Sequence, residues 1–499
     1  MALTDASRPT DITMLTDLYE LTMAQGFWEN GKQDEQACFT AFYRDHPFGS
    51  EYAVMCGSAE LADLVESFRF TDEDISYLAS LSAPAGGSLF SPSFLNYLRD
   101  FRPHVDIDAV PEGELVFPRE PMVRVSGSMF ECQLLETALL NTIGFETLVA
   151  TKTARVVAAA KGRPVAEFGL RRAQGPDGGM AVARASYVAG CASTSNVLAG
   201  RKYGIPVSGT HAHSWVMTFD SELEAFRAFA SSSPKNCTLL IDTYDVREGV
   251  ENAIVVAKEM EARGERLAGI RIDSGDLAKL SAYVRNRFDE EGLDYVKIIV
   301  SNDLDEYTIQ SLLNQGAPVD SFGVGTKLAT CYDQPALGCV YKLAAHRASA
   351  DDPWTPVLKL SEQPYKRTIP GIQKVRRYVD ETGSPVCDMI YDESYIEGDG
   401  TTLVAVNDAA LVTSVRDLSY HELLQPVVRD GAAAAPRESI EAARARCKDA
   451  LDALDPVYKR FLYPQSYMVS MERGLARVRD ELVRERMAAS SSAIPWKRI

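Results

Sequence analysis

The sequence has few of the features that mark secreted, membrane or nucleic-acid-binding proteins. Its nine cysteines are an odd number and form no CxxC pair, so neither a disulfide framework nor a zinc knuckle is indicated. No run reaches the roughly 20 apolar residues of a membrane span, and the first residues lack the apolar core of a secretory signal. Acidic residues outnumber basic ones by 70 to 52, which disfavours nucleic-acid binding. We expect a cytoplasmic protein that binds neither membrane nor nucleic acid.

What is present is typical of a globular chain. Hydrophobic residues make up 46% of the 499 positions and charged residues 24%, enough to bury a sizeable core. At roughly 150 residues per domain, the length allows about three domains.

The middle of the chain repeats a short apolar run, a polar cluster and an amphipathic stretch. Six such runs lie at residues 164–169, 205–209, 237–242, 267–273, 296–301 and 319–325, with helical patterns between them, for example at 221–232, 246–263 and 276–291. Apolar runs without alternation are typical of strands buried in a parallel sheet. The order predicts an α/β barrel or a doubly wound sheet, with ligands at the carboxyl ends of the strands.

The two ends of the chain lack this rhythm. Helical patterns occur at residues 14–29, 59–67, 134–143, 438–454 and 471–487, and strand-like pieces at 357–360, 374–379 and 385–391. Four alanines at 432–435 between Gly and Pro predict a linker. We expect an α+β domain over residues 1–145, an α/β catalytic domain over 146–345, and strands and helices over 346–499 that pack on both.

A histidine pair follows the second predicted strand. The motif VSGTHAHSW at 207–215 contains His211 and His213, although the chain has only six histidines. Capping of the next helix is one alternative. A metal pair would need a third ligand, which no spacing identifies, so a nucleophilic or acid/base histidine is favoured.

Arginines and carboxylates follow other predicted strands. Arg171 and Arg172 in EFGLRRAQG suit a phosphate or carboxylate, with a salt-bridged pair as an equal alternative. Acids occur in IDTYD, RIDSGD and SND, namely Asp242, Asp245, Asp273, Asp276 and Asp303. Each alone is more often a helix cap, but the set suits ribose hydroxyls or Mg²⁺ held through a phosphorylated substrate. With the glycine turn GVGTK at 323–327, these groups favour glycosyl or phosphoryl transfer on a phosphorylated sugar.

Nine motifs occur in order between residue 16 and about residue 482: TDLYELTMAQG, TLVATKTAR, EFGLRRAQGPDGG, SGTHAHSW, IDTYDVREG, GIRIDSGDL, SNDLDEY, FGVGTKLATC and LDPVYKRFLYP. This set resembles the nicotinate phosphoribosyltransferase family. The resemblance implies that nicotinate and phosphoribosyl pyrophosphate give nicotinate mononucleotide and pyrophosphate, driven by ATP hydrolysis, as the first step of NAD salvage. It also implies an irregular, incomplete parallel α/β barrel with a flanking α+β domain built from both chain ends, and a homodimer with shared active sites.

The resemblance implies residue roles around the base and ATP. His213 matches the histidine that ATP phosphorylates, and Arg271 and Thr210 match residues at nicotinate, with His213 and Arg271 counted as catalytic. Arg171 is expected close to the nicotinate carboxylate and the phosphates. His211 receives no role, because family members often carry another residue there.

The remaining roles concern the phosphoribosyl group. Asp242 and Asp273 match acids near the ribose and the Mg²⁺ pyrophosphate, with Asp273 counted as catalytic and Ser274 as substrate-binding. We expect Mg²⁺ to be held through pyrophosphate, with these two acids as its possible protein contacts and no direct metal site. Gly325 and Thr326 match the turn that binds the 5′-phosphate.

The base is expected to stack between Tyr19 of one subunit and Phe168 of the other. Nicotinamide-using relatives place an aspartate in the stretch matching residues 191–200, which here reads CASTSNVLAG and contains no acid. That absence favours nicotinate, and nicotinamide phosphoribosyltransferase is the alternative. A barrel aldolase or phosphosugar isomerase, and a catalytically silent relative, are the other classes left open.

Overall fold

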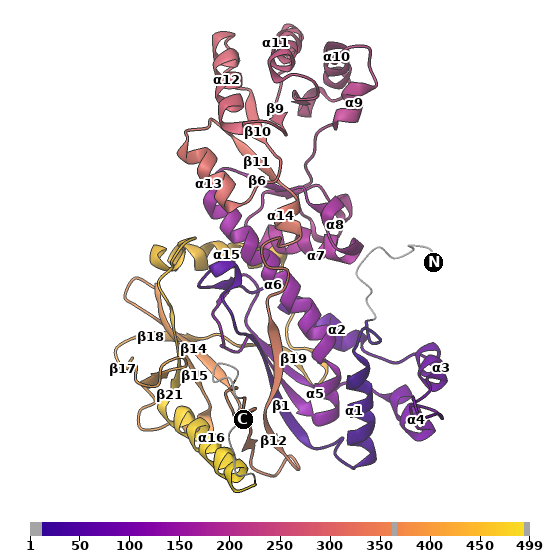
Figure 1. Cartoon of the computed structure of the whole chain (residues 1–499), viewed down its shortest axis with the longest axis vertical. Coiled ribbons are helices and arrows are strands. Elements are labelled where there is room, and N and C mark those ends of the chain that lie inside the picture. The colour runs from indigo at the N-terminus through magenta and orange to yellow at the C-terminus, as the bar shows by residue number, and fades with distance from the viewer. Residues whose placement is uncertain (1–11, 362–366, 494–499) are drawn as a thin grey trace. The chain divides into compact units, whose positions relative to one another are not determined.

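The computed structural model describes residues 12–361 and 367–493, which form two compact units. Unit one combines Met1–Leu148 with Ala336–Ile499, and unit two is Val149–Pro335 (Figure 1). The fold is mixed α/β, with a parallel sheet in unit two and mainly antiparallel sheets in unit one. The nine cysteines are all free. Among the helices of the described residues, none is long and apolar enough to cross a membrane.

Unit two is built on a six-stranded sheet in the order β7-β6-β11-β10-β9-β8, in which every neighbouring pair is parallel. Its strands are β6 (Val165–Glu167), β7 (Ser193–Thr194), β8 (Thr238–Leu240), β9 (Gly269–Ile272), β10 (Lys297–Val300) and β11 (Ser321–Val324). Five of the six predicted runs are therefore strands of one parallel sheet.

The prediction is wrong for the run at 205–209. Only Val207 forms an isolated bridge, to Thr194, and the sixth strand is the short β7. Pro206 has no N–H to donate to a ladder, which limits pairing in this run.

The helices of unit two follow the strands. They are α7 (Gly175–Val188), α8 (Val197–Tyr203), α9 (His213–Met217), α10 (Glu222–Ser232), α11 (Val246–Ala262), α12 (Leu277–Glu290), α13 (Glu306–Asn314) and α14 (Thr326–Ala329). The predictions at 221–232, 246–263 and 276–291 are confirmed to within one residue at each end. Ser221, Asp245 and Asp276 cap these helices by accepting backbone N–H groups.

A buried ion network holds the second part of α6 (Glu136–Ala159), which belongs to unit two from Val149 on, and explains the cations of the motif TLVATKTAR. The Lys152 Nζ atom lies 2.7 Å from Glu306 Oε2, and the Arg155 Nε atom donates to Glu306 Oε1 at 2.8 Å. Both cations and Glu306 are buried. A buried carboxylate needs such partners, so this motif holds the scaffold of unit two.

Unit one contains two larger sheets. The first has the order β13-β12-β1-β5-β3-β19-β20, with β1 (Gln36–Tyr43), β3 (Asp106–Ala109), β5 (Val123–Ser128), β12 (Cys339–Arg347), β13 (Thr355–Pro356), β19 (Gln425–Arg429) and β20 (Ala432–Ala433). All its pairs are antiparallel, and they join strands from both ends of the chain. A two-stranded sheet pairs β2 (Ala53–Val54) with β4 (Leu115–Val116).

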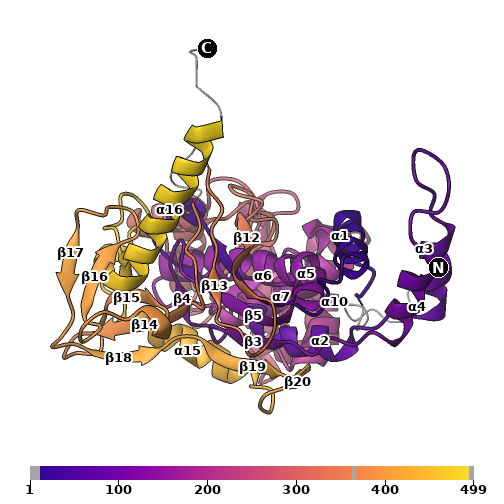
Figure 2. The ribbon, with the colours of Figure 1, turned by 90° about the horizontal axis from the view of Figure 1, so that it is seen from below.

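The second sheet has the order β17-β16-β21-β15-β14-β18. Its strands are β14 (Lys374–Val379), β15 (Pro385–Tyr391), β16 (Thr402–Ala405), β17 (Val412–Ser414), β18 (Ser419–Glu422) and β21 (Met468–Glu472), and only β15 and β21 run parallel. Helix α16 (Arg473–Ala493) packs on β16 and β21, and Figure 2 shows it beside this sheet. The remaining helices of unit one are α1 (Leu18–Glu29), α2 (Leu61–Ser67), α3 (Asp72–Ser80), α4 (Pro92–Asp100), α5 (Met129–Leu134) and α15 (Ile440–Ala453).

Several expectations for the chain ends are corrected. The predicted linker at 432–435 begins with β20, because Ala432 and Ala433 pair with Arg429 and Val428. Residues 357–360 form no strand, since β13 ends before them. The predicted helix at 471–487 starts at Arg473, because its first two residues end β21. Local apolar patterns do not reveal such boundaries, which tertiary pairing sets.

Candidate active site

A pocket of about 430 Å³ lies in unit two where the strands of the parallel sheet end. Residues following β6, β7, β9, β10 and β11 line it, together with the loop before α9. Eight residues expected to act in catalysis or bind substrate are among them, namely Phe168, Arg171, Thr210, His213, Arg271, Asp273, Gly325 and Thr326, and the sequence candidates Arg172, His211 and Asp303 line it as well. The site therefore gathers groups spread over about 160 positions of the chain.

His213 is the first residue of α9, and its side chain is 41% exposed. Its Nδ1 atom lies 3.2 Å from Thr243 Oγ1, and its Nε2 atom lies 3.9 Å from Asp273 Oδ2. One ring nitrogen is thus held by a hydroxyl while the other faces a carboxylate across the pocket. An exposed imidazole in this setting can act as a nucleophile or move a proton.

Arg271 points its guanidinium into the same pocket from β9. Its NH1 group donates to Thr210 Oγ1 at 2.7 Å, whereas its Nε atom is buried and has no hydrogen-bond partner within the described part of the chain. Burial lowers the pKa of Arg271, and Arg171 lowers it further, against the opposing effect of Asp273 and Asp242. A half-buried cation that lines the pocket is suited to an anionic ligand.

Asp242 links two of the polar clusters. Its Oδ2 atom accepts the backbone N–H of Asp273 at 2.8 Å and the hydroxyl of Ser274 at 2.6 Å. Its Oδ1 atom is buried and finds no hydrogen-bond partner among the residues described. The Ser301 hydroxyl donates to Asp273 Oδ1 at 2.5 Å. Asp242 thus holds the backbone of Asp273 and the Ser274 hydroxyl, although neither Asp242 nor Ser274 is among the pocket-lining residues.

The capping alternative applies to other acids of these motifs. Asp245 accepts the N–H groups of Arg247 and Glu248 at the start of α11, and Asp276 accepts that of Lys279 at the start of α12. Neither lines the pocket. In each motif the first acid belongs to the site and the later one caps the helix.

Sequence comparison separates the classes left open. The N-terminal domain model of nicotinate phosphoribosyltransferase matches residues 14–144, the family model matches 164–380, and the C-terminal domain model matches 372–479. The chain belongs to the nicotinate phosphoribosyltransferase family. Its membership excludes the aldolase and isomerase alternatives.

Individual relatives agree with this assignment. The chain is 40% identical over 471 residues to a nicotinate phosphoribosyltransferase of Bacillus subtilis, which covers 92% of this chain and 93% of the relative. It is 46% identical over 336 residues to nicotinate phosphoribosyltransferase pncB2 of Mycobacterium tuberculosis, covering 67% and 71%. The crystal structure of human nicotinic acid phosphoribosyltransferase is similar, with a TM-score of 0.82, 31% identity, and 94% and 99% coverage.

Glu167 supports the site without lining the pocket, a role that the sequence does not reveal. It ends β6, is buried, and accepts the Thr194 hydroxyl at 2.6 Å and the backbone N–H of Gly169. Burial raises its pKa, and these two hydrogen bonds oppose the rise. By joining β6, β7 and the following loop, Glu167 fixes the base of the segment that carries Phe168 and Arg171.

The turns after β10 and β11 also depend on conformation that composition does not reveal. Asn302 and Asp303 line the pocket with φ of 94° and 42°, in the left-handed region that Asn and Asp tolerate best. Lys327 of GVGTK lies 2.6 Å from Asp305, which caps α13. This ion pair joins the two turns, so Lys327 holds the glycine turn in place.

Gly169→Ala is expected to disturb this part of the site. A Cβ atom at Gly169 would lie 2.3 Å from Ala329 Cβ and 2.8 Å from the Gly325 carbonyl oxygen, so the loops after β6 and β11 must separate. Overpacking of this kind costs about 1–3 kcal/mol. We expect a lower melting temperature and a fall in kcat/KM of about tenfold or more.

The matched control is Gly178→Ala in α7, where a Cβ meets no heavy atom within 4 Å. It should keep both the melting temperature and kcat/KM. A Gly169→Ala enzyme that matches this control in calorimetry and steady-state kinetics would show that the two loops are free to move apart.

Tyr19 lies on α1 of unit one and is 47% exposed. It is not among the residues that line the pocket of unit two. Burial of its hydroxyl and the hydrogen bond to Glu20 raise its pKa, so the phenol stays neutral. Leu18 and Met23 of the same helix are exposed as well, and exposed apolar side chains of this kind are available for a contact outside their own unit.

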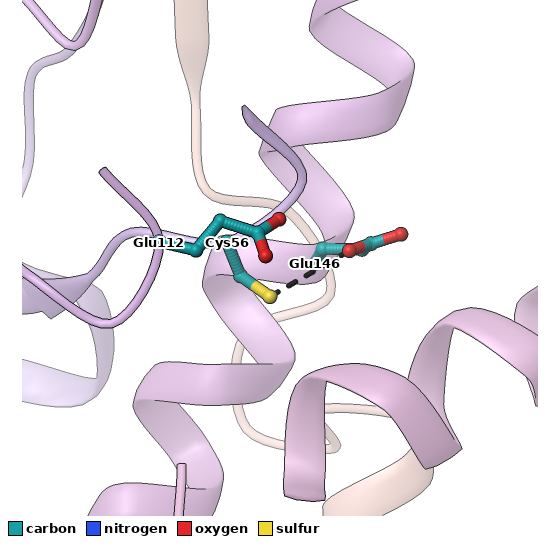
Figure 3. Close-up of side chains that lie close together, drawn as sticks. All are labelled: Cys56, Glu112 and Glu146. Atoms are coloured by element: carbon teal, nitrogen blue, oxygen red, sulfur yellow. Dashed lines mark hydrogen bonds between the residues drawn. The ribbon is translucent and has the colours of Figure 1, made fainter. Parts of the chain in front are cut away.

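A second polar cluster lies in unit one, where Cys56, Glu112 and Glu146 come close together (Figure 3). Glu112 Oε1 accepts the N–H groups of Gly57 and Ala59, at 2.7 and 3.3 Å. The Cys56 thiol donates to Glu146 Oε2 over 3.6 Å. These contacts are those of a buried hydrogen-bonded turn, and we assign no metal to it.

Proposed function

We propose that the protein transfers the phosphoribosyl group of phosphoribosyl pyrophosphate to nicotinate, coupled to ATP hydrolysis through a phosphohistidine. The nicotinate ring nitrogen forms a bond to the anomeric carbon, and the bond from that carbon to pyrophosphate breaks, so pyrophosphate leaves with the electron pair. The observation that carries this proposal is the half-buried Arg271, which lines one pocket with Asp273 and whose Nε donor has no hydrogen-bond partner in the described part of the chain. Arg271 can bind the anionic base, and the neighbouring Asp273 carboxylate is suited to the ribose.

The arginines would hold the base. Arg271 and Arg171 provide two guanidinium groups for the nicotinate carboxylate, and Thr210 fixes the orientation of Arg271 through its 2.7 Å hydrogen bond. Gly323 leaves room for Phe168, because a Cβ there would lie 2.6 Å from the Phe168 ring. The ring of Phe168 would face the base on one side, with Tyr19 of the partner subunit on the other.

The carboxylates would hold the ribose and the leaving group. Glycosyl transfer passes through a state with positive charge on the sugar, so orientation and charge stabilisation matter more than a strong base. Asp273 is held by Ser301 and by its backbone contact to Asp242. The glycine turn with Thr326 offers N–H groups for the 5′-phosphate.

The donor set at Asp242 and Asp273 fits Mg²⁺ bound together with pyrophosphate. The buried Asp242 Oδ1 atom, without a partner in the described residues, and the pocket-lining Asp273 carboxylate are the oxygen ligands that Mg²⁺ prefers. When bound, the ion neutralises charge on the departing pyrophosphate. The two carboxylates would hold the ion that binds the pyrophosphate, and Asp242 would do so while keeping its hydrogen bond to Ser274.

His213 would accept the phosphoryl group of ATP. The γ-phosphorus–oxygen bond breaks, a bond from phosphorus to a ring nitrogen forms, and ADP leaves; water later releases phosphate. The exposure of the ring and its position beside Asp273 support this role. A phosphoryl group adds about −1.5 to −2 charges by analogy with other side chains, and the nearby carboxylate would repel it, which can reorganise the loop.

The shape of the sheet, the oligomeric state and the location of the protein are part of the same proposal. We infer that the six-stranded parallel sheet belongs to an irregular, incomplete barrel, supported by the Val207 bridge that extends the sheet beyond β7. We infer a homodimer with shared active sites, supported by the exposed Tyr19. A cytoplasmic location is supported by nine free cysteines, eight of them buried.

Nicotinate is expected to be preferred over nicotinamide. The stretch at 191–200 contributes Ser195 to the pocket and contains no acid. A charge-assisted hydrogen bond contributes about 1.5–3 kcal/mol, so kcat/KM should favour the acid by roughly 10- to 150-fold. Steady-state rates of pyrophosphate release with each base, with and without ATP, measure this.

The matched variant is Ser195→Asp, which places a carboxylate in the pocket. It should lower kcat/KM for nicotinate and narrow the ratio between the two bases, because like charges repel. A wild-type enzyme that prefers nicotinamide would refute the assignment of the base.

A further inference from the structure

His211 has a defined place in the structure although its motif alone assigns it no role. Its side chain is buried, with 7% of the residue exposed, and its ring stands edge-on against Phe229 at a centroid distance of 4.7 Å. Its Nε2 atom accepts the backbone N–H of Leu240 at 3.1 Å, and its Nδ1 atom lies 3.3 Å from the Ala212 carbonyl oxygen. Since Nε2 faces a donor and Nδ1 an acceptor, the contacts select the neutral ring with its proton on Nδ1.

The contact reaches the edge of the parallel sheet. Leu240 is the last residue of β8, which is the terminal strand of the sheet and pairs only with β9. The N–H group of Leu240 is buried, and a strand edge leaves such a group without a ladder partner. The imidazole of His211 supplies the missing acceptor, as a neighbouring strand would.

The same loop is also tied at its other polar side chains. Thr210 accepts from Arg271 of β9, His211 accepts from Leu240, and His213 contacts Thr243, three residues beyond Leu240. The loop thus runs alongside β8 and the segment that follows it. Among these three contacts, that of His211 involves a main-chain group of the sheet. It therefore fixes the loop to the backbone of β8, which moves less than a side chain.

We propose that His211 is a positioning residue for His213: its ring ties the loop at 209–213 to β8 and thereby sets where the His213 ring stands relative to Thr243 and Asp273. The functional part rests on the proposed phosphorylation of His213. Burial lowers the pKa of His211 against the opposing effect of its hydrogen bond to Ala212, and Arg271 and His213 lower it further, which favours the neutral ring as a hydrogen-bond acceptor.

Two variants separate the hydrogen bond from packing. His211→Leu keeps an apolar group against Phe229 but has no acceptor, and His211→Gln ends in an amide oxygen close to the position of Nε2. A third, His211→Asn, stays polar but is too short to reach Leu240, and it replaces the leucine variant if that protein does not fold.

The first readout is structural and independent of activity. In the full-length protein, hydrogen exchange at the Leu240 amide should accelerate at least tenfold in His211→Leu and His211→Asn, and return to within threefold in His211→Gln. The rate at which diethyl pyrocarbonate acylates His213, read by mass spectrometry, should change at least threefold in the same two variants and recover in His211→Gln. Unchanged acylation with an exposed Leu240 amide would overturn the proposal.

The second readout is the ratio of the ATP-stimulated rate to the ATP-independent rate with nicotinate. It should fall at least tenfold in His211→Leu and His211→Asn and recover in His211→Gln. A ratio that stays at the wild-type value in the first two would overturn the functional part. If the wild-type enzyme itself shows no ATP stimulation, the proposed coupling fails, and the exchange and acylation rates alone decide whether His211 positions His213.

Discussion

His213→Ala is expected to abolish the stimulation of the reaction by ATP while some ATP-independent turnover of nicotinate remains. Other residues of the pocket are expected to bind the base, the ribose and the phosphate. The glycosyl-transfer step therefore keeps its binding groups when the imidazole is removed. The coupling step loses its only proposed phosphoryl acceptor. Pyrophosphate release measured with and without ATP should give a ratio of about one in this variant.

His213→Asn is the matched control. It separates the loss of the polar contact to Thr243 from the loss of the phosphoryl acceptor. Its amide can keep a polar contact near the hydroxyl but cannot carry the phosphoryl group, so it should lose ATP stimulation as alanine does. Wild-type protein incubated with γ-labelled ATP should retain acid-labile label, and both variants should retain none. Unchanged ATP stimulation in either variant would rule out the phosphohistidine.

The proposed phosphorylation of His213 would act through local charge. The His213 Nε2 atom lies 3.9 Å from Asp273 Oδ2, and a phosphoryl group between them would bring like charges together. Relief requires that the loop moves or that a cation enters. Either outcome links ATP cleavage to the carboxylate that we expect to orient the ribose and pyrophosphate, so ATP should alter substrate KM as well as rate.

The sequence predicted the strands of unit two well because they are short apolar runs buried on both faces. The two-residue strand β7 was missed, since Ser193 and Thr194 are polar and pair only because β6 lies beside them. The run at 205–209 is predicted to be a strand but forms none, because its apolar residues include Pro206. Pairing partners, which a local pattern does not contain, decided both cases.

The same limit applies to the site. The acids at the strand ends could be found from spacing, but only the structure separates Asp242 and Asp273 from the helix caps Asp245 and Asp276. In the sequence, Glu167 is one more acid at a strand end. Its role depends on its burial and on the Thr194 hydroxyl and the Gly169 N–H that it accepts. Spacing gives the place of a side chain, and the orientation of its oxygen atoms depends on contacts across the sheet.

Arg271→Ala is expected to reduce kcat/KM for nicotinate by about 30- to 5,000-fold. Removing one partner of a hydrogen-bonded charge pair in a desolvated site costs about 2–5 kcal/mol, and here the loss also frees Thr210 from its fixed orientation. Arg271→Lys keeps the charge but not the fork that reaches Thr210 and the ligand together, so its loss should be intermediate. Steady-state kinetics with nicotinate at saturating phosphoribosyl pyrophosphate gives both values.

The choice of base distinguishes what Arg271 contacts. If its spare Nε donor serves the nicotinate carboxylate, nicotinamide should lose much less in Arg271→Ala, and the preference for the acid should shrink. Arg227→Ala is the control, because that side chain forms an exposed ion pair with Glu259 and should leave kcat/KM within twofold. If Arg271→Ala lowers kcat/KM equally for both bases, Arg271 contacts the phosphoribosyl group and not the base. Arg171 would then be the residue that recognises the nicotinate carboxylate.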